Sequence, residues 1–253
     1  MPLNIWLDPS PRPGYANMAI DQALLDLARD RGERWLRVYQ WEPHCLSFGR
    51  HEPASRRYDQ ERIAALGLDV VRRPTGGRAV WHGGEVTYAL AGPHRELGGL
   101  REAYLGIHRL LLDGLRALGV EGELAPVSRA TGVDAGSCFA STAGGEIMVG
   151  GRKVVGSAQL RQGSALLQHG SILLVDDQSM VRQVTRGTAP TDLAAPLARV
   201  LGRAPQPAAV AQALASAAER WSGGCRPACP DRVLEVAASH FPRFRAEEWT
   251  WQS

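Results

Sequence analysis

Lysine is almost missing from this chain of 253 residues: Lys153 is the one lysine among 29 basic residues, and the others are arginine. Arginine, alanine, glycine and proline are plentiful, which indicates a compositional bias acting on the whole chain. Under such a bias a solvated lysine can become arginine at little cost, because both side chains keep their charge in water. Either Lys153 survives by chance, or its position needs a compact ammonium group rather than a planar guanidinium.

Long apolar runs, a leader sequence and paired cysteines are also missing. No run of about 18 uncharged apolar residues occurs, which excludes a helical membrane span. The opening residues lack the basic start and apolar stretch of a secretory signal. Four cysteines are too few for a disulfide scaffold, so we expect a protein of the reducing cytoplasm. The net charge of +3 comes without a basic tract, which argues against nucleic acid as a partner.

Strand patterns concentrate in residues 34–175, with helical patterns at both ends of the chain. This distribution predicts an α+β fold, with a sheet domain over 1–180 and a helical C-terminal extension over 181–253 packed on it. Two helices are predicted, one capped by Asn17 and stopped by Gly32 and one over 99–118. Strands are predicted over 35–41, 68–72, 86–91 and 166–175, with a glycine-rich loop over 73–84. Residues 146–149 and 153–159 are predicted to form a hairpin around Gly150-Gly151.

Two glycines flanked by arginines stand in the first motif, RRPTGGRAVWH, which begins at Arg72 and ends at His82. Paired glycines let backbone N–H groups approach a ligand closely, and arginines supply charge-assisted donors. The motif therefore indicates a site for an anion or a carbonyl group. A plain turn with solvated arginines explains the same residues equally well.

Two later segments carry further candidate chemistry. GRKVVGSAQ places Lys153 at a strand edge before small residues, where its ammonium could donate to a carbonyl or an oxyanion. A surface lysine after a hairpin is the simpler alternative. In QHGSILL, His169 lies within an apolar strand, where a histidine is commonly a satisfied core residue.

Together these three segments resemble the superfamily of lipoate–protein ligases and octanoyltransferases, which is related to biotin–protein ligases. KVVGSAQ and HGSILL match its motifs, and the earlier MAIDQALL and LSFGRHE are similar to its opening helix and strand. In the first motif Arg78 replaces a third glycine, and Gly83 replaces the usual aspartate after His82. The resemblance covers roughly residues 4–180.

The resemblance implies a mixed, largely antiparallel sheet flanked by helices, and an acyl chain held in a narrow apolar tunnel. It places Lys153 at the position of the family's signature lysine. It also implies a set of substrate-binding residues, with Val71 as a further tunnel wall: Arg73, Gly76, Gly77, Arg78, Ala79, Val80, His82, Gly156, Ser157, Ala158, His169 and Gly170.

Cysteine placement distinguishes the members of this superfamily. Cys138, in Ser137-Cys138-Phe139 upstream of Lys153, resembles the nucleophile of ligase-like octanoyltransferases, although residues 140–146 depart from their pattern. A buried, inert cysteine is the alternative. Cys45 is predicted to be core. Only His240 lies near Cys225 and Cys229 in the sequence, and a structural zinc site usually needs four ligands, so no metal site is expected.

The predicted activity is therefore octanoyl transfer, catalysed by Cys138 and Lys153, from octanoyl-acyl carrier protein to a lysine of a lipoyl domain or glycine-cleavage H protein. The predicted enzyme needs no cofactor, binds no membrane and is a monomer. The alternatives are a lipoate–protein ligase that uses ATP and Mg²⁺, an amidotransferase between lipoyl domains, and a non-catalytic paralogue that binds lipoyl domains.

Overall fold

The computed structural model describes residues 1–126, 144–187 and 194–252, so Cys138 lies outside the described residues. The strands are β1 (Leu3–Leu7), β2 (Arg34–Tyr39), β3 (Cys45–Phe48), β4 (Asp69–Arg72), β5 (Val80–His82), β6 (Glu85–Pro93), β7 (Glu123–Leu124), β8 (Ile147–Val149), β9 (Arg152–Lys153), β10 (Val155–Gln162), β11 (Ala165–Leu173) and β12 (Cys225–Pro227). The helices are α1 (Gly14–Arg31), α2 (Ala54–Arg57), α3 (Gln60–Ala65), α4 (His94–Leu97), α5 (Leu100–Arg116), α6 (Ser179–Val184), α7 (Leu197–Leu201), α8 (Pro207–Ser222), α9 (Asp231–Ala238), α10 (Phe241–Arg245) and α11 (Glu247–Thr250).

The central sheet has, within the described residues, six strands in the order β10-β11-β6-β2-β1-β12. Neighbours from β10 to β2 are antiparallel, whereas β1 runs parallel to both β2 and β12. The predicted α+β class with a mixed, largely antiparallel sheet is therefore confirmed.

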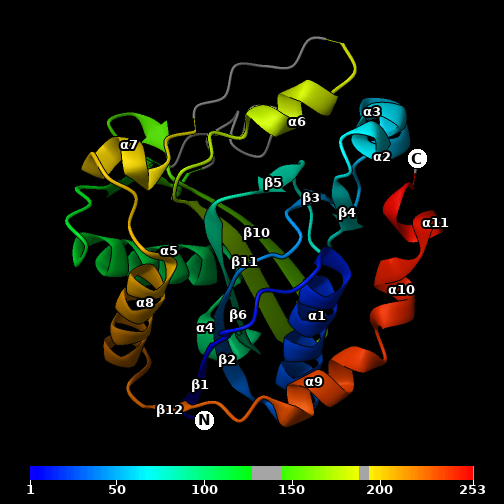
Figure 1. Cartoon of the computed structure of the whole chain (residues 1–253). Helices are drawn as coiled ribbons and strands as arrows, with labels where there is room; N and C mark the ends of the chain where they lie inside the picture. The colour runs from blue at the N-terminus through cyan, green and yellow to red at the C-terminus, as the bar shows by residue number, and fades with distance from the viewer. Residues whose placement is uncertain (127–143, 188–193, 253) are drawn as a thin grey trace.

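Helices cover both faces of this sheet, as Figure 1 shows. α5 and α8 pack together on one face, and α1, backed by α9 and α10, packs on the other. Successive side chains of strand β2 point to opposite faces of the sheet, so β2 contributes to the core on both sides. Leu36 and Val38 lie in the core beneath α5 and α8, whereas Trp35 and Tyr39 lie in the core around α1. A polar side chain on either face therefore needs a hydrogen-bond partner within the protein.

Helix α1 ends where the sequence predicts, at Gly32 with φ of 68°. Its predicted start is wrong, because the helix begins at Gly14 and Asn17 lies buried within it. The side-chain amide of Asn17 donates to the carbonyl oxygens of Arg12 and Gln40. Asn17 thus ties the helix to neighbouring backbone instead of capping it.

The predicted concentration of strands in residues 34–175 is confirmed by β2 to β11, but two further strands lie outside this range. β1 lies near the N-terminus, and β12 brings part of the predicted helical extension into the central sheet. β12 has three residues, one of them proline, so its own pattern is weak. It forms because the ends of β1 supply partners: Leu3 N donates to Gly224 O, and Ala228 N donates to Ile5 O, each at 2.9 Å. The boundary at residue 180 stays a prediction.

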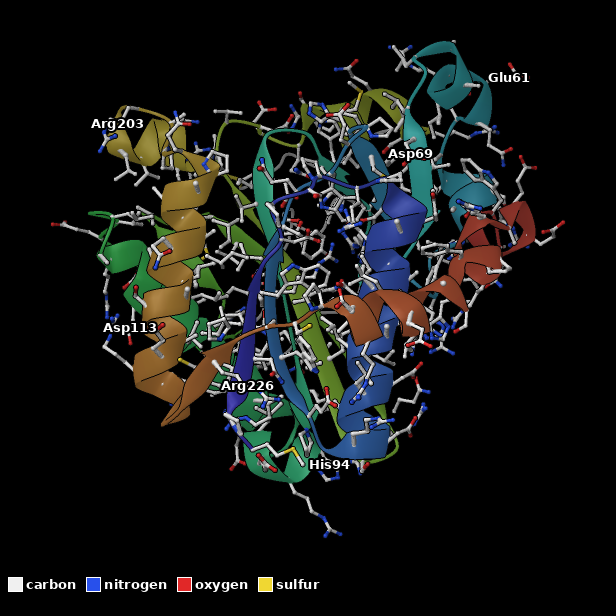
Figure 2. All side chains as sticks on the ribbon, turned by 60° about the horizontal axis from the view of Figure 1, so that its bottom comes forward. Glu61, Asp69, His94, Asp113, Arg203 and Arg226 are labelled. Atoms are coloured by element: carbon white, nitrogen blue, oxygen red, sulfur yellow. The ribbon has the colours of Figure 1, made fainter. Side chains whose placement is uncertain are left out.

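A second sheet, β4-β3-β5, lies beside the start of α1. The backbone N–H of Gly14 donates to the Asp69 carboxylate of β4 at 3.0 Å, and Figure 2 shows Asp69 near that end of the helix. The segment 73–84, predicted as a loop throughout, contains β5. This short strand forms because β3 supplies an antiparallel partner along Cys45–Ser47.

The predicted hairpin around Gly150-Gly151 is confirmed as β8 and β9, with Met148 opposite Lys153. The strand predicted over 153–159 is not continuous in one sheet. Val154 N donates to Ile147 O at 3.1 Å, while its own carbonyl accepts from Leu173 N at 3.2 Å. The chain therefore passes at Val154 from the hairpin sheet into the central sheet, where it continues as β10.

Candidate active site

One cavity lies where the predicted motifs meet. It encloses about 320 Å³ of space not filled by atoms, part of it open to solvent. Its walls come from α1, from the central sheet and from β3 and β5. The lining residues that the sequence predicted are Arg73, Val80, His82, Gly156, Ser157, Ala158, His169 and Gly170. Those that it did not predict are Met18, Tyr39, Trp41, Ser47, Thr87 and Ser171.

The remaining predicted binding residues and Val71 are not among the residues that line this cavity, and their roles stay predictions. Gly77 has φ of 91°, and a Cβ atom on Gly49 would lie 1.8 Å from the Gly77 carbonyl oxygen. The glycine-rich segment therefore packs directly against the backbone after β3. A Cβ on Gly76 would meet no atom within 4 Å. Arg78 and Ala79 are buried.

The motif arginines are buried, so the alternative of solvated arginines is wrong. Arg72 donates to carbonyl oxygens of the segments 49–52 and 249–252. Arg73 donates through Nη2 to the carbonyl oxygens of Gly76 and Arg78, at 3.0 and 2.6 Å. Arg73 thus holds the glycine-rich segment in place, whereas Arg72 ties the segment after β3 to the C-terminal residues.

His82 forms the centre of a hydroxyl–imidazole–carboxylate chain. Its Nε2 lies 2.8 Å from Ser47 Oγ, and its Nδ1 lies 3.1 Å from Glu85 Oε1. The ring stacks on Trp41, with centroids 3.8 Å apart. Burial lowers the pKa of His82, and the neighbouring Glu85 carboxylate opposes that shift.

His169 has both ring nitrogens engaged. Nδ1 lies 2.7 Å from the Asp21 carboxylate, and Nε2 lies 2.6 Å from Thr75 Oγ1. Asp21 also pairs with Arg37 at 3.4 Å and accepts from Tyr39 OH at 2.8 Å. His169 is therefore a satisfied buried residue that also lines the cavity, and it connects α1 to the glycine-rich segment.

Ser157 joins the cavity to a third histidine. Its Oγ lies 2.8 Å from His108 Nε2 and 2.8 Å from Tyr88 OH. His108 Nδ1 lies 2.6 Å from the Gly145 carbonyl oxygen. Burial lowers the pKa of His108 to about 4, against the opposing effect of its hydrogen bond to Gly145 and with a contribution from the charge of Lys153. His108 is therefore neutral at physiological pH.

Lys153 lies buried beside a carboxylate. Its Nζ donates to Glu146 Oε1 at 2.5 Å, and the side chains are 1% and 5% exposed. Removing one partner of such a pair is costly, because the other charge stays buried. The backbone carbonyl of Lys153 accepts from Ala195 N at 2.9 Å. The structure thus rules out the alternative of a solvated surface lysine.

Five residues that organise this site were missed as functional candidates from the sequence: Asp21, Ser47, Glu85, His108 and Glu146. Asp21 and Ser47 stand in MAIDQALL and LSFGRHE, which were used only to support the family resemblance. His108 lies in the helix predicted over 99–118. The spacing of apolar residues that predicts a helix does not show which polar side chains its buried face will contact. Cys138 lies outside the described residues, and Cys45 is buried as predicted.

Comparison with known proteins places the chain in a family. Residues 13–219 match the model of the lipoyl protein ligase A/B catalytic domain. The chain belongs to this family of catalytic domains.

Within this family, the chain is similar to proteins named as octanoyltransferases. The chain is 44% identical over 177 residues to Octanoyltransferase LipM of Carboxydothermus hydrogenoformans, covering 68% of this chain and 65% of that protein. It is 42% identical over 187 residues to Octanoyltransferase LipM of Moorella thermoacetica, covering 69% and 67%. The match thus spans about two thirds of the length of these relatives.

Solved structures share the fold. A crystal structure of lipoate-protein ligase A bound with ATP superposes with a TM-score of 0.82 at 20% identity, covering 99% of both chains. A bi-partite lipoate protein ligase from Thermoplasma acidophilum gives a TM-score of 0.79 at 18% identity, covering 99% of this chain and 96% of that one.

Proposed function

We propose that this protein is an octanoyltransferase of lipoate biosynthesis, which moves an octanoyl group from octanoyl-acyl carrier protein to a lysine of a lipoyl domain or glycine-cleavage H protein. The observation that carries the proposal is the similarity, at about 40% identity, to proteins named Octanoyltransferase LipM. The cavity that collects the motif residues supports it, because an acyl chain needs an enclosed apolar site.

Cys138 is the proposed nucleophile of the first half-reaction. An unperturbed thiol has a pKa of about 8.5, so a nearby cation is needed to raise its thiolate fraction at neutral pH. The thiolate attacks the carbonyl carbon of the octanoyl thioester, the new C–S bond forms, and the carrier's thiolate leaves. Lys153 supplies the positive charge for the oxyanion of this step. Its buried contact with Glu146 supports a fixed ammonium group rather than a mobile surface charge.

The cavity supplies binding energy for the acyl chain. Part of the cavity wall is apolar, formed by Met18, Trp41 and Val80. Along β10 the lining residues Gly156 and Ala158 are small and leave space for a ligand. An octanoyl tail has about seven methylene or methyl groups, and at about 0.8 kcal/mol each its full burial contributes at most about 5–6 kcal/mol. Cavity depth would therefore select the chain length.

In the second half-reaction the acceptor's lysine amine attacks octanoyl-Cys138, and an amide replaces the thioester. Exchange between thioesters is nearly isoenergetic and amide formation from a thioester is downhill, so the proposed reaction needs neither ATP nor Mg²⁺.

The proposed enzyme acts as a monomer in the cytoplasm. Among the described residues no helix is both long enough and apolar enough to cross a bilayer. The mild positive charge suits acidic carrier and lipoyl proteins.

The test is intact mass spectrometry after mixing the protein with octanoyl-acyl carrier protein in the absence of ATP, beside the variant Cys138→Ala. We expect a hydroxylamine-labile gain of one octanoyl group in the wild type alone, followed by transfer to an apo lipoyl domain. Absence of the wild-type adduct, together with lipoylation that requires lipoate, ATP and Mg²⁺, would show a ligase instead.

A further inference from the structure

Arg72 links two segments that lie far apart in the chain. Its side chain is fully buried at the end of β4. Nη1 donates to three carbonyl oxygens of the segment 49–52, at 2.8 to 3.0 Å. Nε donates to Trp249 O at 2.7 Å, and Nη2 donates to Gln252 O at 2.9 Å. A lysine ammonium could not replace these contacts, because only a guanidinium spreads its donors over a planar fork.

The C-terminal residues return this contact. Trp249 Nε1 donates to the backbone carbonyl oxygen of Arg72 at 2.9 Å. The Arg243 guanidinium lies 3.9 Å from the centroid of the Trp249 ring. The ring centroids of Trp251 and Phe48 are 5.2 Å apart. Figure 1 shows α10 and α11, in red, along the side of β4. Hydrogen bonds and ring contacts therefore dock the C-terminal helices on the sheet β4-β3-β5.

The segment 49–52 connects this docked region to the cavity. Arg50 N donates to Thr75 O at 2.8 Å, and Thr75 Oγ1 lies 2.6 Å from Nε2 of His169. His169 lines the cavity. β4 also continues directly into Arg73, which is a second lining residue. A series of direct contacts thus joins the C-terminal residues to side chains of the cavity.

We propose that residues 249–252 position the glycine-rich segment beside the cavity through Arg72, so that affinity for the acyl chain depends on the C-terminal helices. The inference rests on the octanoyl transfer proposed above. Arg72 and Trp249 are positioning residues, because neither lines the cavity. Their hydrogen bonds fix the backbone at 49–52, and that backbone holds Thr75, the partner of His169.

A role in stability alone would have a different signature. The hydrogen bonds of Arg72 contribute to the free energy of unfolding whether or not a ligand is present. A positioning role adds an effect on ligand affinity in the folded protein, because a preorganised wall loses less freedom when the acyl chain binds. Stability and affinity measured on the same variants therefore separate the two roles.

The two test variants weaken the link from either side. Trp249→Phe removes the indole donor to Arg72 and keeps a ring, whereas Arg72→Lys keeps the charge but not the fork. Trp221→Phe is the matched control, because it makes the same change in α8, at a ring that packs against Arg34 and does not line the cavity.

Three quantities are measured for each variant. Calorimetric titration with sodium octanoate gives the dissociation constant of the acyl chain. Steady-state transfer to an apo lipoyl domain gives kcat and the KM for octanoyl-acyl carrier protein. Chemical denaturation gives the free energy of unfolding.

We expect the dissociation constant of octanoate and the KM for octanoyl-acyl carrier protein to rise about threefold in Trp249→Phe and about tenfold in Arg72→Lys, with kcat unchanged, because only binding is weakened. Trp221→Phe should leave both constants unchanged. Unchanged constants in Trp249→Phe, or an equal rise in Trp221→Phe, would overturn the positioning role, and this comparison decides even where Arg72→Lys does not fold.

The positioning role and the proposed function fail separately. If the wild type binds octanoate but transfers no octanoyl group, the proposed function is rejected. Octanoate affinity does not depend on transfer, so Trp249→Phe and Trp221→Phe still decide the role of the C-terminal residues. Absence of octanoate binding in the wild type would reject both, because the cavity would then hold no acyl chain.

Discussion

Two walls of the cavity carry the same pair of side chains with different third partners. On the β3–β5 side, Ser47 donates to His82, whose other nitrogen faces the Glu85 carboxylate. On the β10 side, Ser157 donates to His108, whose other nitrogen faces the Gly145 carbonyl. A carboxylate can stabilise an imidazolium, whereas a neutral carbonyl stabilises it far less. The same hydroxyl–imidazole pair therefore has a carboxylate as its third partner on one wall and a neutral carbonyl on the other.

The largest expected effect concerns His108 and the pH dependence of stability. Its pKa is about 4 in the folded protein, against about 6.5 in the unfolded chain, so between these values the unfolded state binds more protons. Stability from this group is fully present above about pH 6.5 and is lost as the pH falls towards 4. At about 1.4 kcal/mol per unit, the loss amounts to about 3 kcal/mol.

Urea unfolding of the wild type and of His108→Gln between pH 4 and 7.5 measures this effect. The variant should lack this part of the pH slope. Equal slopes in both proteins would show that His108 is not held neutral by burial.

The next effect compares the two histidines in catalysis. His82→Gln should slow octanoyl transfer at pH 7.5 by about 10-fold, because one hydrogen bond of about 1.4 kcal/mol is lost at the cavity wall, while His108→Gln should change it by less than about threefold per folded molecule. The reason is that His82 lines the cavity and faces a carboxylate, whereas His108 lies behind Ser157. Comparable losses in the two variants would remove the distinction between the walls.

A smaller effect concerns the third histidine, which fixes the glycine-rich segment. Thr75→Val keeps the side-chain shape but leaves His169 Nε2 without its donor, which should cost about 1–2 kcal/mol of unfolding free energy. A double-mutant cycle with His169→Leu isolates the pair, with an expected coupling of about 1 kcal/mol. A coupling near zero would show that the 2.6 Å contact contributes no net stability.

For each histidine contact of the site, the sequence identified one of the two partners as a candidate and missed the other. Arg73, His82, Ser157 and His169 stand in short contiguous motifs, so their residue types could be recognised together. Their partners come from elsewhere: Asp21 lies 148 positions from His169, Ser47 35 from His82 and His108 49 from Ser157. Such pairs exist only once strands and helices pack, and local periodicity cannot report them.

The fold shows the same limit. Strong periodicity located α5 and the end of α1 correctly, because an amphipathic stripe and an αL glycine are local features. β12 and β5 have three residues each and exist through their partners β1 and β3. Their prediction would have required the sheet order in advance.

The last comparison concerns two buried tyrosines that extend these networks, whose variants should differ by about 1 kcal/mol. Tyr88 OH donates to the neutral Ser157 hydroxyl and accepts from Gln168 at 2.8 Å, whereas Tyr39 OH donates to the Asp21 carboxylate. Tyr88→Phe should cost about 1 kcal/mol of unfolding free energy, and Tyr39→Phe about 1.5–3 kcal/mol, because hydrogen bonds to charged groups are stronger. Chemical denaturation of both variants at pH 7.5 measures the difference. If Tyr88→Phe were the more destabilising, the neutral network around Ser157 would contribute more to stability than the hydrogen bond of Tyr39 to the Asp21 carboxylate.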